Sequence, residues 1–356
     1  MIPSAENQPK ISVIIPVYNM SAYLKDALES LRSQTLKEWE AVCIDDGSTD
    51  ASPEILEAYA RMDARFRVFR QENRGVSAAR NRAIELAAGE YLFFLDPDDW
   101  LADEGVFSDL YAAAVLHGVH ICGGSFREYA GDRVVTEWTG KNAPYTFARD
   151  GMVSYADYQF DYGWVRFIYD RDFIVGSGFR LPEYTFFEDP VFFVRAMDKA
   201  RVFYALRRPV YCYRRGHKPR ELSYGRTLDL VRGLRDNIVF ANDRGYSQLA
   251  ALETTRLLSE YSGHILRYAH EEDARELRAL LEEVDSVLYP DQGGRIAYLM
   301  CRNQLDKEQA RQMKLSDELN RIKGSRTWKL GRILTAIPRR IRRVFSTLLS
   351  RPRRED

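Results

Sequence analysis

The sequence predicts an α/β fold, namely a doubly wound, mostly parallel sheet with helices on both faces, followed by a helical C-terminal region. Three observations lead to this fold class. Short apolar runs alternate with amphipathic segments between residues 11 and 126, which is the pattern of a parallel sheet. Residues 227–288 then have a predominantly helical pattern. The chain of 356 residues, 45% of them hydrophobic, is also long enough to bury a large core.

The elements of the sheet are predicted in the following order. Apolar runs form the strands, at residues 11–16, 40–46, 66–71, 90–96 and 119–126. Amphipathic segments form the helices between the first four strands, at residues 21–34, 51–62 and 75–89. Ser21 is the expected N-cap of the first helix, Pro53 lies in the first turn of the second, and Gly89 closes the third. Right-handed crossovers then give a sheet that binds ligands beyond the carboxyl ends of its strands.

Beyond residue 126 the pattern loosens into aromatic-rich turns and short strands, with one helix expected at about residues 188–199. Residues 291–322 are predicted to form a polar helix with a weak coiled-coil signal. Four of its six heptad core positions are apolar, namely Leu305, Leu315, Leu319 and Ile322. The sequence therefore predicts an α/β domain at 1–225, a helical region at 226–322 and a basic amphipathic tail at 323–356.

The net charge of zero hides an uneven distribution of charge. Residues 323–356 hold 11 of the 52 Lys and Arg but only 2 of the 52 Asp and Glu, so the rest of the chain is mildly acidic. This distribution argues against a nucleic-acid-binding protein. The four cysteines match no zinc or disulfide spacing, and neither a signal-peptide core nor a spanning segment of ~20 apolar residues is present. A cytoplasmic protein is therefore expected.

Polar residues gather where three predicted strands end. The segments are PVYN (16–19), DDGSTD (45–50) and DPDD (96–99). Crowded carboxylates resist ionising together, and a divalent cation removes that repulsion. Mg²⁺ or Mn²⁺ accepts one or two carboxylates while the phosphates of a substrate complete its octahedron. The alternative for one such cluster is a solvated Asp-rich turn. Two acidic clusters at adjacent strand ends, with a Tyr-Asn pair at a third, favour a binding site.

Four segments together resemble the family 2 glycosyltransferases with the GT-A fold. They are ISVIIPVYN (11–19), CIDDGSTD (43–50), NRGVSAARNRAIELAAGEYLFFLDPDDW (73–100) and FFEDPVFFVRA (186–196), in the order and spacing of the family. The resemblance covers residues 10–215 and makes residues 1–225 a GT-A domain. It implies inverting transfer of a sugar from a nucleotide-diphosphate sugar, with UDP as the expected nucleotide. The expected acceptor is a hydroxyl of a glycan or a lipid-linked glycan in surface polysaccharide synthesis, and the expected cofactor is Mn²⁺ or Mg²⁺.

The donor site implied by the resemblance involves Asp96, which is taken up below with the metal site, and five further residues. Pro16, Tyr18 and Asp45 would cradle the base, and either Asp45 or Asp46 would accept a hydrogen bond from a pyrimidine N–H. Both carboxylates can instead stabilise the turn that follows them, which is the interpretation favoured for Asp46. Arg80 would approach the diphosphate from its helix, and the alternative is an exposed helix charge.

The resemblance also implies a metal site and a loop over the diphosphate. Asp98 would coordinate the metal directly, Asp96 would bind the ribose or the metal, and Asp99 would be a second ligand or an orienting group. Arg214 and His217, in the segment YCYRRGHKPRELS (211–223), would close over the diphosphate, and His217 would complete the metal ligands. The alternative is a solvated basic turn.

An inverting transfer needs a base that deprotonates the acceptor hydroxyl. By resemblance Asp189 is this base, Glu188 orients or binds the acceptor, and the flanking aromatic residues can raise the pKa of a buried carboxylate. The pair can also complement the dipole at a helix N-terminus, which is compatible with catalysis. Trp164 resembles the acceptor-side aromatic residue of the family, and the alternative is that it packs in the core.

Two rival functions remain to be weighed. A haloacid-dehalogenase-like phosphatase would use Asp96 as its phosphoryl acceptor, but that family has Thr or Val where this chain has Trp100. A non-catalytic sugar-binding scaffold on the same fold is the second rival. The intact acidic motifs argue against it, because such a protein has no reason to keep repelling carboxylates.

The basic tail predicts an amphipathic helix at the cytoplasmic face of the inner membrane. Its apolar residues share one arc of a helical wheel, namely Leu330, Ile333, Leu334, Ile337, Ile341, Val344, Phe345 and Leu348. Basic side chains occupy the remaining circumference, a pattern typical of binding to anionic headgroups. Pro338 is expected to kink or split this helix. The alternative is that the apolar stripe packs on the protein's own body or on a partner in a homo-oligomer.

Overall fold

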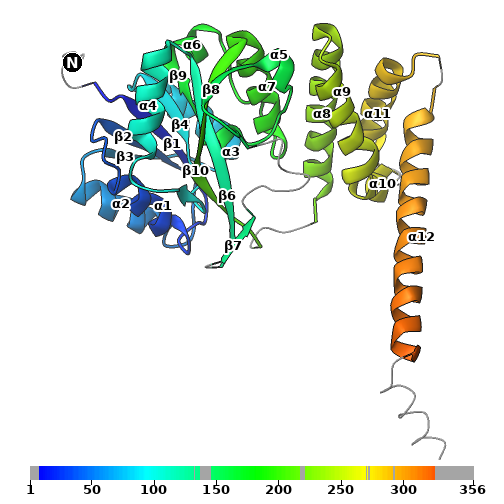
Figure 1. Cartoon of the computed structure of the whole chain (residues 1–356). Helices are drawn as coiled ribbons and strands as arrows, with labels where there is room; N and C mark the ends of the chain where they lie inside the picture. Colours follow the sequence, from blue (N-terminus) through cyan, green and yellow to red (C-terminus); the bar gives the residue numbers. More distant parts are fainter. Residues whose placement is uncertain are drawn as a thin grey trace, which may run out of the picture. The chain divides into compact units, whose positions relative to one another are not determined.

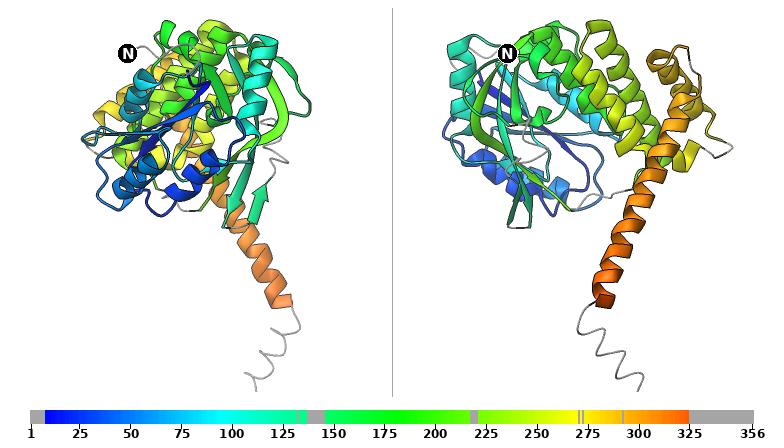
Figure 2. Two further views of the ribbon diagram at one scale, coloured as in Figure 1. Left: turned by 90° about the vertical axis from the view of Figure 1, so that its left-hand side faces the viewer. Right: turned by 45° about the vertical axis from the view of Figure 1, so that its right-hand side comes forward.

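The computed structural model describes residues 8–131, 133–136, 146–216, 221–269, 271, 273–291 and 293–324. The chain divides into two compact units, residues 1–297 and residues 298–356, and each is described by itself. A mixed sheet with helices on both faces lies at the centre of the first unit (Figures 1 and 2). Within the described residues the sheet has ten strands. Eight follow the order β3-β2-β1-β4-β9-β6-β10-β5, while β7 pairs with β6 and β8 with β10.

The first four strands pair in parallel with one another, as predicted. They are β1 (Ile11–Val17), β2 (Trp39–Asp45), β3 (Phe66–Arg70) and β4 (Tyr91–Phe94). The helices that connect them are α1 (Leu24–Arg32), α2 (Ser52–Met62) and α3 (Val76–Leu86). Because β1 pairs with both β2 and β4, the carboxyl ends of these three strands meet at one edge of the sheet. The predicted α/β fold class is confirmed.

The second part of the sheet mixes parallel and antiparallel pairs. Strand β9 (Phe167–Asp170) lies between β4 and β6 (Ile121–Ala130) and is antiparallel to both. Strand β6, predicted at 119–126, pairs in parallel with β10 (Val202–Arg214). The remaining strands are β5 (Trp100–Leu101), β7 (Arg133–Thr136) and β8 (Gly151–Ser154). The helices of this part are α4 (Val106–His117), α5 (Tyr155–Tyr158), a 3₁₀ turn (Trp164–Arg166), α6 (Arg171–Gly176) and α7 (Glu188–Ala200).

Two predicted helix ends are wrong, and each has a local reason. Ser21 is not an N-cap, because α1 begins at Leu24 and the backbone N–H of Ser21 donates to Asp50 Oδ2 at 3.0 Å. Gly89 lies beyond the end of α3 and does not cap it. A Cβ at Gly89 would lie 2.6 Å from the backbone nitrogen of Ser12, so close approach of two backbones requires glycine there.

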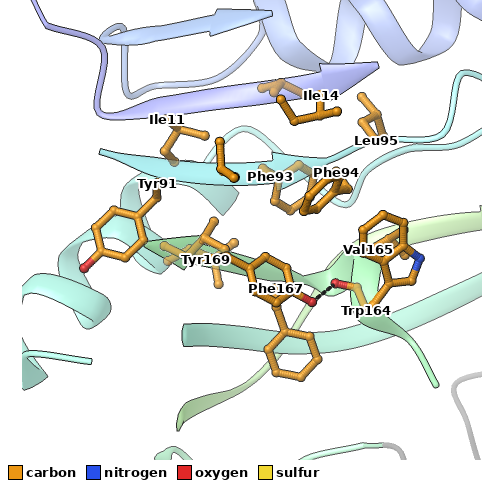
Figure 3. Close-up of a cluster of buried hydrophobic side chains, with 14 of the residues drawn as sticks. Ile11, Ile14, Tyr91, Phe93, Phe94, Leu95, Trp164, Val165, Phe167 and Tyr169 are labelled. Carbon is orange, nitrogen blue, oxygen red and sulfur yellow. Dashed lines mark hydrogen bonds between the residues drawn. The ribbon is translucent and has the colours of Figure 1, made fainter. Parts of the chain in front are cut away.

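Buried apolar side chains, many of them aromatic, pack together in the core, as Figure 3 shows. Phe94 of β4 packs against Trp164 with ring centroids 4.3 Å apart, and against Phe192 at 5.8 Å. The hydroxyl of Tyr169 on β9 donates to the backbone oxygen of Trp164 at 2.7 Å (Figure 3). Such aromatic pairs add about 0.5–1.5 kcal/mol each beyond the area they bury. They fix the 3₁₀ turn against the end of β4.

Helices form most of the described chain from residue 224 onward, as predicted. They are α8 (Tyr224–Arg244), α9 (Ser247–Thr255), a π-helical turn (Arg256–Glu260), α10 (Ser262–Ala269), α11 (Arg275–Leu288) and α12 (Arg295–Gly324). Ser223 caps α8, and Gly245 ends it in the left-handed region at φ 72°. Leu305 and Leu315 of α12 are exposed in the single chain, and their pairing in a coiled coil stays a prediction.

The basic tail lies outside the described residues apart from its first two positions, the end of α12. Among the described residues, no helix combines the length and the apolar character needed to cross a membrane.

Candidate active site

A cleft of about 350 Å³ opens at the edge of the sheet where β1, β2 and β4 end. It brings together residues that are far apart in the sequence, and six of the predicted site residues line it. They are Pro16, Tyr18, Asp46, Arg80, Asp96 and Asp98. The cleft is also lined by residues that sequence reasoning did not assign to donor binding, among them Val76 and Thr185. Of the other predicted residues, His217 lies outside the described residues, and Asp45, Asp99, Trp164, Glu188, Asp189 and Arg214 do not line this cleft.

The end of β1 presents one exposed aromatic side chain to the cleft. Tyr18 is 46% exposed and lines the cleft, so its ring is free to contact a ligand. Asn19 instead shapes the neighbouring loop, because its Oδ1 accepts from the backbone N–H of Thr49 at 2.8 Å. Its positive φ of 54° is a conformation that Asn tolerates better than most residues. The Tyr-Asn pair therefore divides into an exposed residue that lines the cleft and a residue that shapes the neighbouring loop.

Asp45 and Asp46 both accept hydrogen bonds from backbone N–H groups. Asp45 is almost fully buried and does not line the cleft, and its Oδ1 accepts from the N–H of Ser48 at 2.9 Å. Asp46 accepts from the backbone of Arg74 through Oδ1 and from that of Gly75 through Oδ2, both at 2.9 Å. These bonds fix the turn and the chain entering α3, and donor binding by either carboxylate stays a prediction.

Three carboxylates at the end of β4 form a cluster suited to a metal ion. Asp96, Asp98 and Asp99 each offer an oxygen, and these atoms all lie within 4.8 Å of one another. Asp96 and Asp98 line the cleft. Hard carboxylate oxygens beside a cleft are the donor set that Mg²⁺ or Mn²⁺ prefers. The residues present therefore fit the expected metal.

Asp99 is held differently from its two neighbours. The hydroxyl of Tyr211 donates to its Oδ2 at 2.9 Å, and the backbone N–H of Arg214 donates to its Oδ1 at 2.7 Å. Both carboxylate oxygens of Asp99 thus accept hydrogen bonds from β10, which favours the orienting role over direct coordination of a metal. Tyr211 also accepts from the backbone N–H of Asp96 at 3.2 Å. No sequence spacing pointed to Tyr211, since it lies more than one hundred residues beyond the motif.

Arg80 joins the acidic motif to the later Glu-Asp motif. Its Nη2 donates to Asp96 Oδ1 at 2.7 Å, and its Nη1 donates to Glu188 Oε1 at 2.6 Å. Burial alone would lower the pKa of Arg80, but the charges of Asp96, Glu188 and Asp189 raise it above the ordinary value. The side chain therefore stays charged. It is only 5% exposed, so the alternative of an exposed helix charge is wrong.

Trp164 lies beneath this ion pair. It is 3% exposed, and the guanidinium carbon of Arg80 lies 4.9 Å from its ring centroid. The ring packs on Phe94 and Phe192, so the structure gives Trp164 the core-packing role that the sequence left open. A cation held over an indole face gains roughly 0.5–2 kcal/mol, which helps to fix Arg80. Contact with an acceptor stays a prediction.

Glu188 and Asp189 begin α7, directly after a residue in an unusual conformation. Phe187 has φ 69°, a left-handed conformation that is costly for a bulky residue. Burial and the charge of Glu188 raise the pKa of Asp189 to about 8, while Arg80 opposes the rise. A carboxylate with a raised pKa is a stronger base than an ordinary aspartate, which suits proton abstraction near neutral pH.

The segment of the predicted diphosphate loop, residues 211–223, is described except for residues 217–220. Arg214 ends β10, and its Nε donates to the backbone oxygen of Asp98 at 2.9 Å. Its Nη2 donates to Asp26 Oδ2 at 2.6 Å, and its guanidinium lies over the ring of Trp100. Arg214 thus braces the turn that carries Asp98, and it does not line the cleft. His217 lies outside the described residues.

Comparison with known proteins agrees with the family resemblance seen in the sequence. The family model "Glycosyl transferase family 2" matches residues 12–174. The "Putative glycosyltransferase EpsH" of Bacillus subtilis is 35% identical over 218 residues, which cover 58% of this chain and 61% of that protein. The "Uncharacterized glycosyltransferase EpsJ" of the same organism is 30% identical over 246 residues, covering 67% of this chain and 71% of that protein. The matched region is thus less than two thirds of EpsH.

Solved structures support the fold. Residues 1–349 of Staphylococcus aureus TarS in complex with UDP-GlcNAc have a TM-score of 0.66 at 22% identity, covering 82% of this chain and 83% of that chain. The mannosyltransferase PcManGT from Pyrobaculum calidifontis, in complex with GDP-Man and Mn²⁺, has a TM-score of 0.50 at 16% identity, covering 84% and 88%. At these identities the likeness concerns the GT-A fold alone.

Proposed function

The chain belongs to the family 2 glycosyltransferases, and we propose that it moves a sugar, with inversion, from a nucleotide-diphosphate sugar to an acceptor hydroxyl. The observation that carries this proposal is the position of Arg80, whose guanidinium bonds both Asp96 and Glu188. Arg80 lines the cleft, and it thereby links the candidate metal-binding motif to Glu188, the neighbour of the candidate base Asp189. Membership of this family excludes the phosphatase alternative built on Asp96. The proposed acceptor is a glycan or lipid-linked glycan in surface polysaccharide synthesis.

The donor is proposed to bind with its diphosphate toward Asp96 and Asp98. Pro16, Tyr18 and the Asp45–Asp46 turn would hold the base, and the two aspartates would hold Mn²⁺ or Mg²⁺ with Asp99 as orienting group. When bound, such an ion neutralises charge on the departing diphosphate. The fold neighbours solved in complex with UDP-GlcNAc and with GDP-Man and Mn²⁺ support this class of donor and metal. We propose UDP as the nucleotide.

Asp189 is proposed to take the proton of the acceptor hydroxyl. The oxygen then bonds to the anomeric carbon while the bond from that carbon to the diphosphate breaks, so the nucleoside diphosphate leaves with the bonding electrons. Attack opposite the leaving group inverts the anomeric centre. Glu188 is held by Arg80 and would fix the orientation of the motif or of the acceptor, with Trp164 supporting Arg80 from below.

Incubation with a panel of nucleotide sugars tests the function. Purified protein with Mn²⁺ is expected to release nucleotide slowly from one donor in the absence of acceptor, because water can replace the acceptor hydroxyl. Release should require the metal and stop on addition of a chelator. The proposal would be refuted if no nucleotide were released from any UDP-, GDP- or dTDP-sugar, with or without glycan acceptors. That result would favour the sugar-binding scaffold.

The basic tail is proposed to hold the protein at the cytoplasmic face of the membrane, where lipid-linked acceptors lie. Residues 323–356 carry 11 basic and 2 acidic residues, and each basic residue near an anionic surface contributes about 1 kcal/mol. Deleting residues 324–356 is expected to abolish co-sedimentation with anionic vesicles while donor hydrolysis stays unchanged. Binding of the full chain should weaken above physiological salt. Full-length protein that ignores anionic vesicles at low salt would contradict this role and favour packing on protein or a homo-oligomer.

A further inference from the structure

The loop that leads into the Glu-Asp motif, residues 181–187, is fixed at its start by the donor-side helix. Asn81 of α3 donates to the backbone oxygen of Leu181 at 2.8 Å and accepts from its N–H at 2.9 Å. Ser77 of the same helix donates to the backbone oxygen of Tyr184 at 3.0 Å. Helix α3 also carries Arg80, so the donor side of the cleft and this loop share one support.

The second half of the loop is fixed by α8. Asp229 Oδ2 accepts from both the backbone N–H and the hydroxyl of Thr185, each at 2.8 Å. The other oxygen of Asp229 accepts from Arg232 at 2.8 Å, which orients the carboxylate. About two turns further along α8, Asp236 accepts from the hydroxyl of Tyr184 at 2.8 Å. The hydroxyl and backbone donors thus find charged acceptors, which form stronger hydrogen bonds than neutral ones.

Helix α8 also accommodates the unusual conformation of Phe187. A Cβ at Gly233 would lie 2.8 Å from the Phe187 ring and 3.0 Å from its backbone oxygen, so only glycine allows this approach. A non-glycine residue at φ 69° costs about 1–3 kcal/mol and persists only where its surroundings impose it. The next two residues are Glu188 and Asp189. The conformation that places them therefore depends on α8.

We propose that α8 positions the base for transfer, with Asp229 as the positioning residue that acts through Thr185. This inference rests on the proposed function. Helix α8 begins at residue 224, beyond the 12–174 range of the family match, so under this proposal a part of the chain outside that match positions the base. Misplacing a reacting group by about 1 Å can cost about 10²-fold in rate. A loop released from Asp229 should therefore lower turnover without altering donor binding.

The test compares Asp229→Ala with Asp198→Ala in the full chain. Asp198 is a matched control, because its carboxylate also joins α7 to the helical region, accepting from the Tyr246 hydroxyl at 2.7 Å, but away from the loop. Asp229→Ala is expected to lower kcat for transfer by about 10²-fold. Its affinity for UDP with Mn²⁺, measured by calorimetry, should remain that of the wild type. Hydrogen exchange at the Thr185 amide should accelerate, and Asp198→Ala should leave all three readouts unchanged.

A milder pair of variants keeps the proposal testable if Asp229→Ala does not fold. Thr185→Val removes the hydroxyl donor and is expected to lower kcat, whereas Thr185→Ser retains it and should restore kcat. Three outcomes would overturn the inference. They are wild-type turnover in Asp229→Ala, a loss of turnover in Asp198→Ala equal to that in Asp229→Ala, and failure of Thr185→Ser to restore turnover. A wild-type enzyme inactive on every donor would instead refute the proposed function, so the two failures are distinguishable.

Discussion

Replacing Asp98 by asparagine is expected to abolish metal-dependent nucleotide binding and sugar transfer together, while the protein stays folded. The amide keeps the size of the carboxylate but removes the charge that attracts a hard divalent cation. Changing a group that only orients a metal ligand costs 10–100-fold in affinity, so losing a direct ligand should cost more than about 10²-fold. Calorimetric titration with UDP and Mn²⁺ measures the binding, and circular dichroism checks the fold.

Two further variants separate coordination from general effects of charge. Asp103 lies five positions after Asp98, and its partly exposed carboxylate pairs with Arg208. Asp103→Asn should therefore leave nucleotide binding intact. Asp99→Asn should weaken binding less than Asp98→Asn, because Asp99 binds Tyr211 and the backbone of Arg214. Unchanged nucleotide affinity in Asp98→Asn would remove this residue from the proposed metal site.

The sequence predicted the elements whose signals are local. Strands β1 to β4 are short apolar runs, and the polar segments after three of them meet at one edge because parallel neighbours end together. The antiparallel insertion of β9 between β4 and β6 was not predicted, since its four residues lie in an aromatic-rich stretch with no alternating pattern. Pairing of strands distant in sequence depends on tertiary packing, which local patterns do not encode.

The candidate site was predicted in its residue types but not in its connections. Arg80 and Glu188 are far apart in sequence, and nothing in their spacing shows that a buried ion pair joins them. The same holds for Asp229, which looks like an ordinary polar position of a helix. Thr185 could have been considered, because it lies three residues before Glu188 in the same segment. The sequence alone could not show that Tyr18 is exposed and Trp164 buried, and this difference separates a side chain that lines the cleft from one that packs in the core.

The proposed base in the Glu-Asp motif, Asp189, leads to the most direct prediction about the chemical step. Asp189→Asn is expected to bind donor and metal normally but to transfer sugar about 10²–10⁴ times more slowly, the usual contribution of a general base. The reason is that asparagine cannot accept the proton of the acceptor hydroxyl, while Arg80 keeps its partners Asp96 and Glu188. Single-turnover transfer measures the chemical step, and UDP titration measures the donor site. Asp198→Asn, on the same helix, is the control and should behave like the wild type.

The pH dependence of kcat/KM provides an independent check on the same residue. A general base works when deprotonated, so a pKa raised to about 8 by burial and by Glu188 means that activity falls as pH drops through that region. An ordinary aspartate, with a pKa near 3.9, would leave activity flat down to about pH 5. The acid limb should be absent from the residual activity of Asp189→Asn. If the wild-type profile is flat, or if donor affinity falls in parallel with rate in the variant, Asp189 is not the base and its carboxylate serves donor binding or the fold.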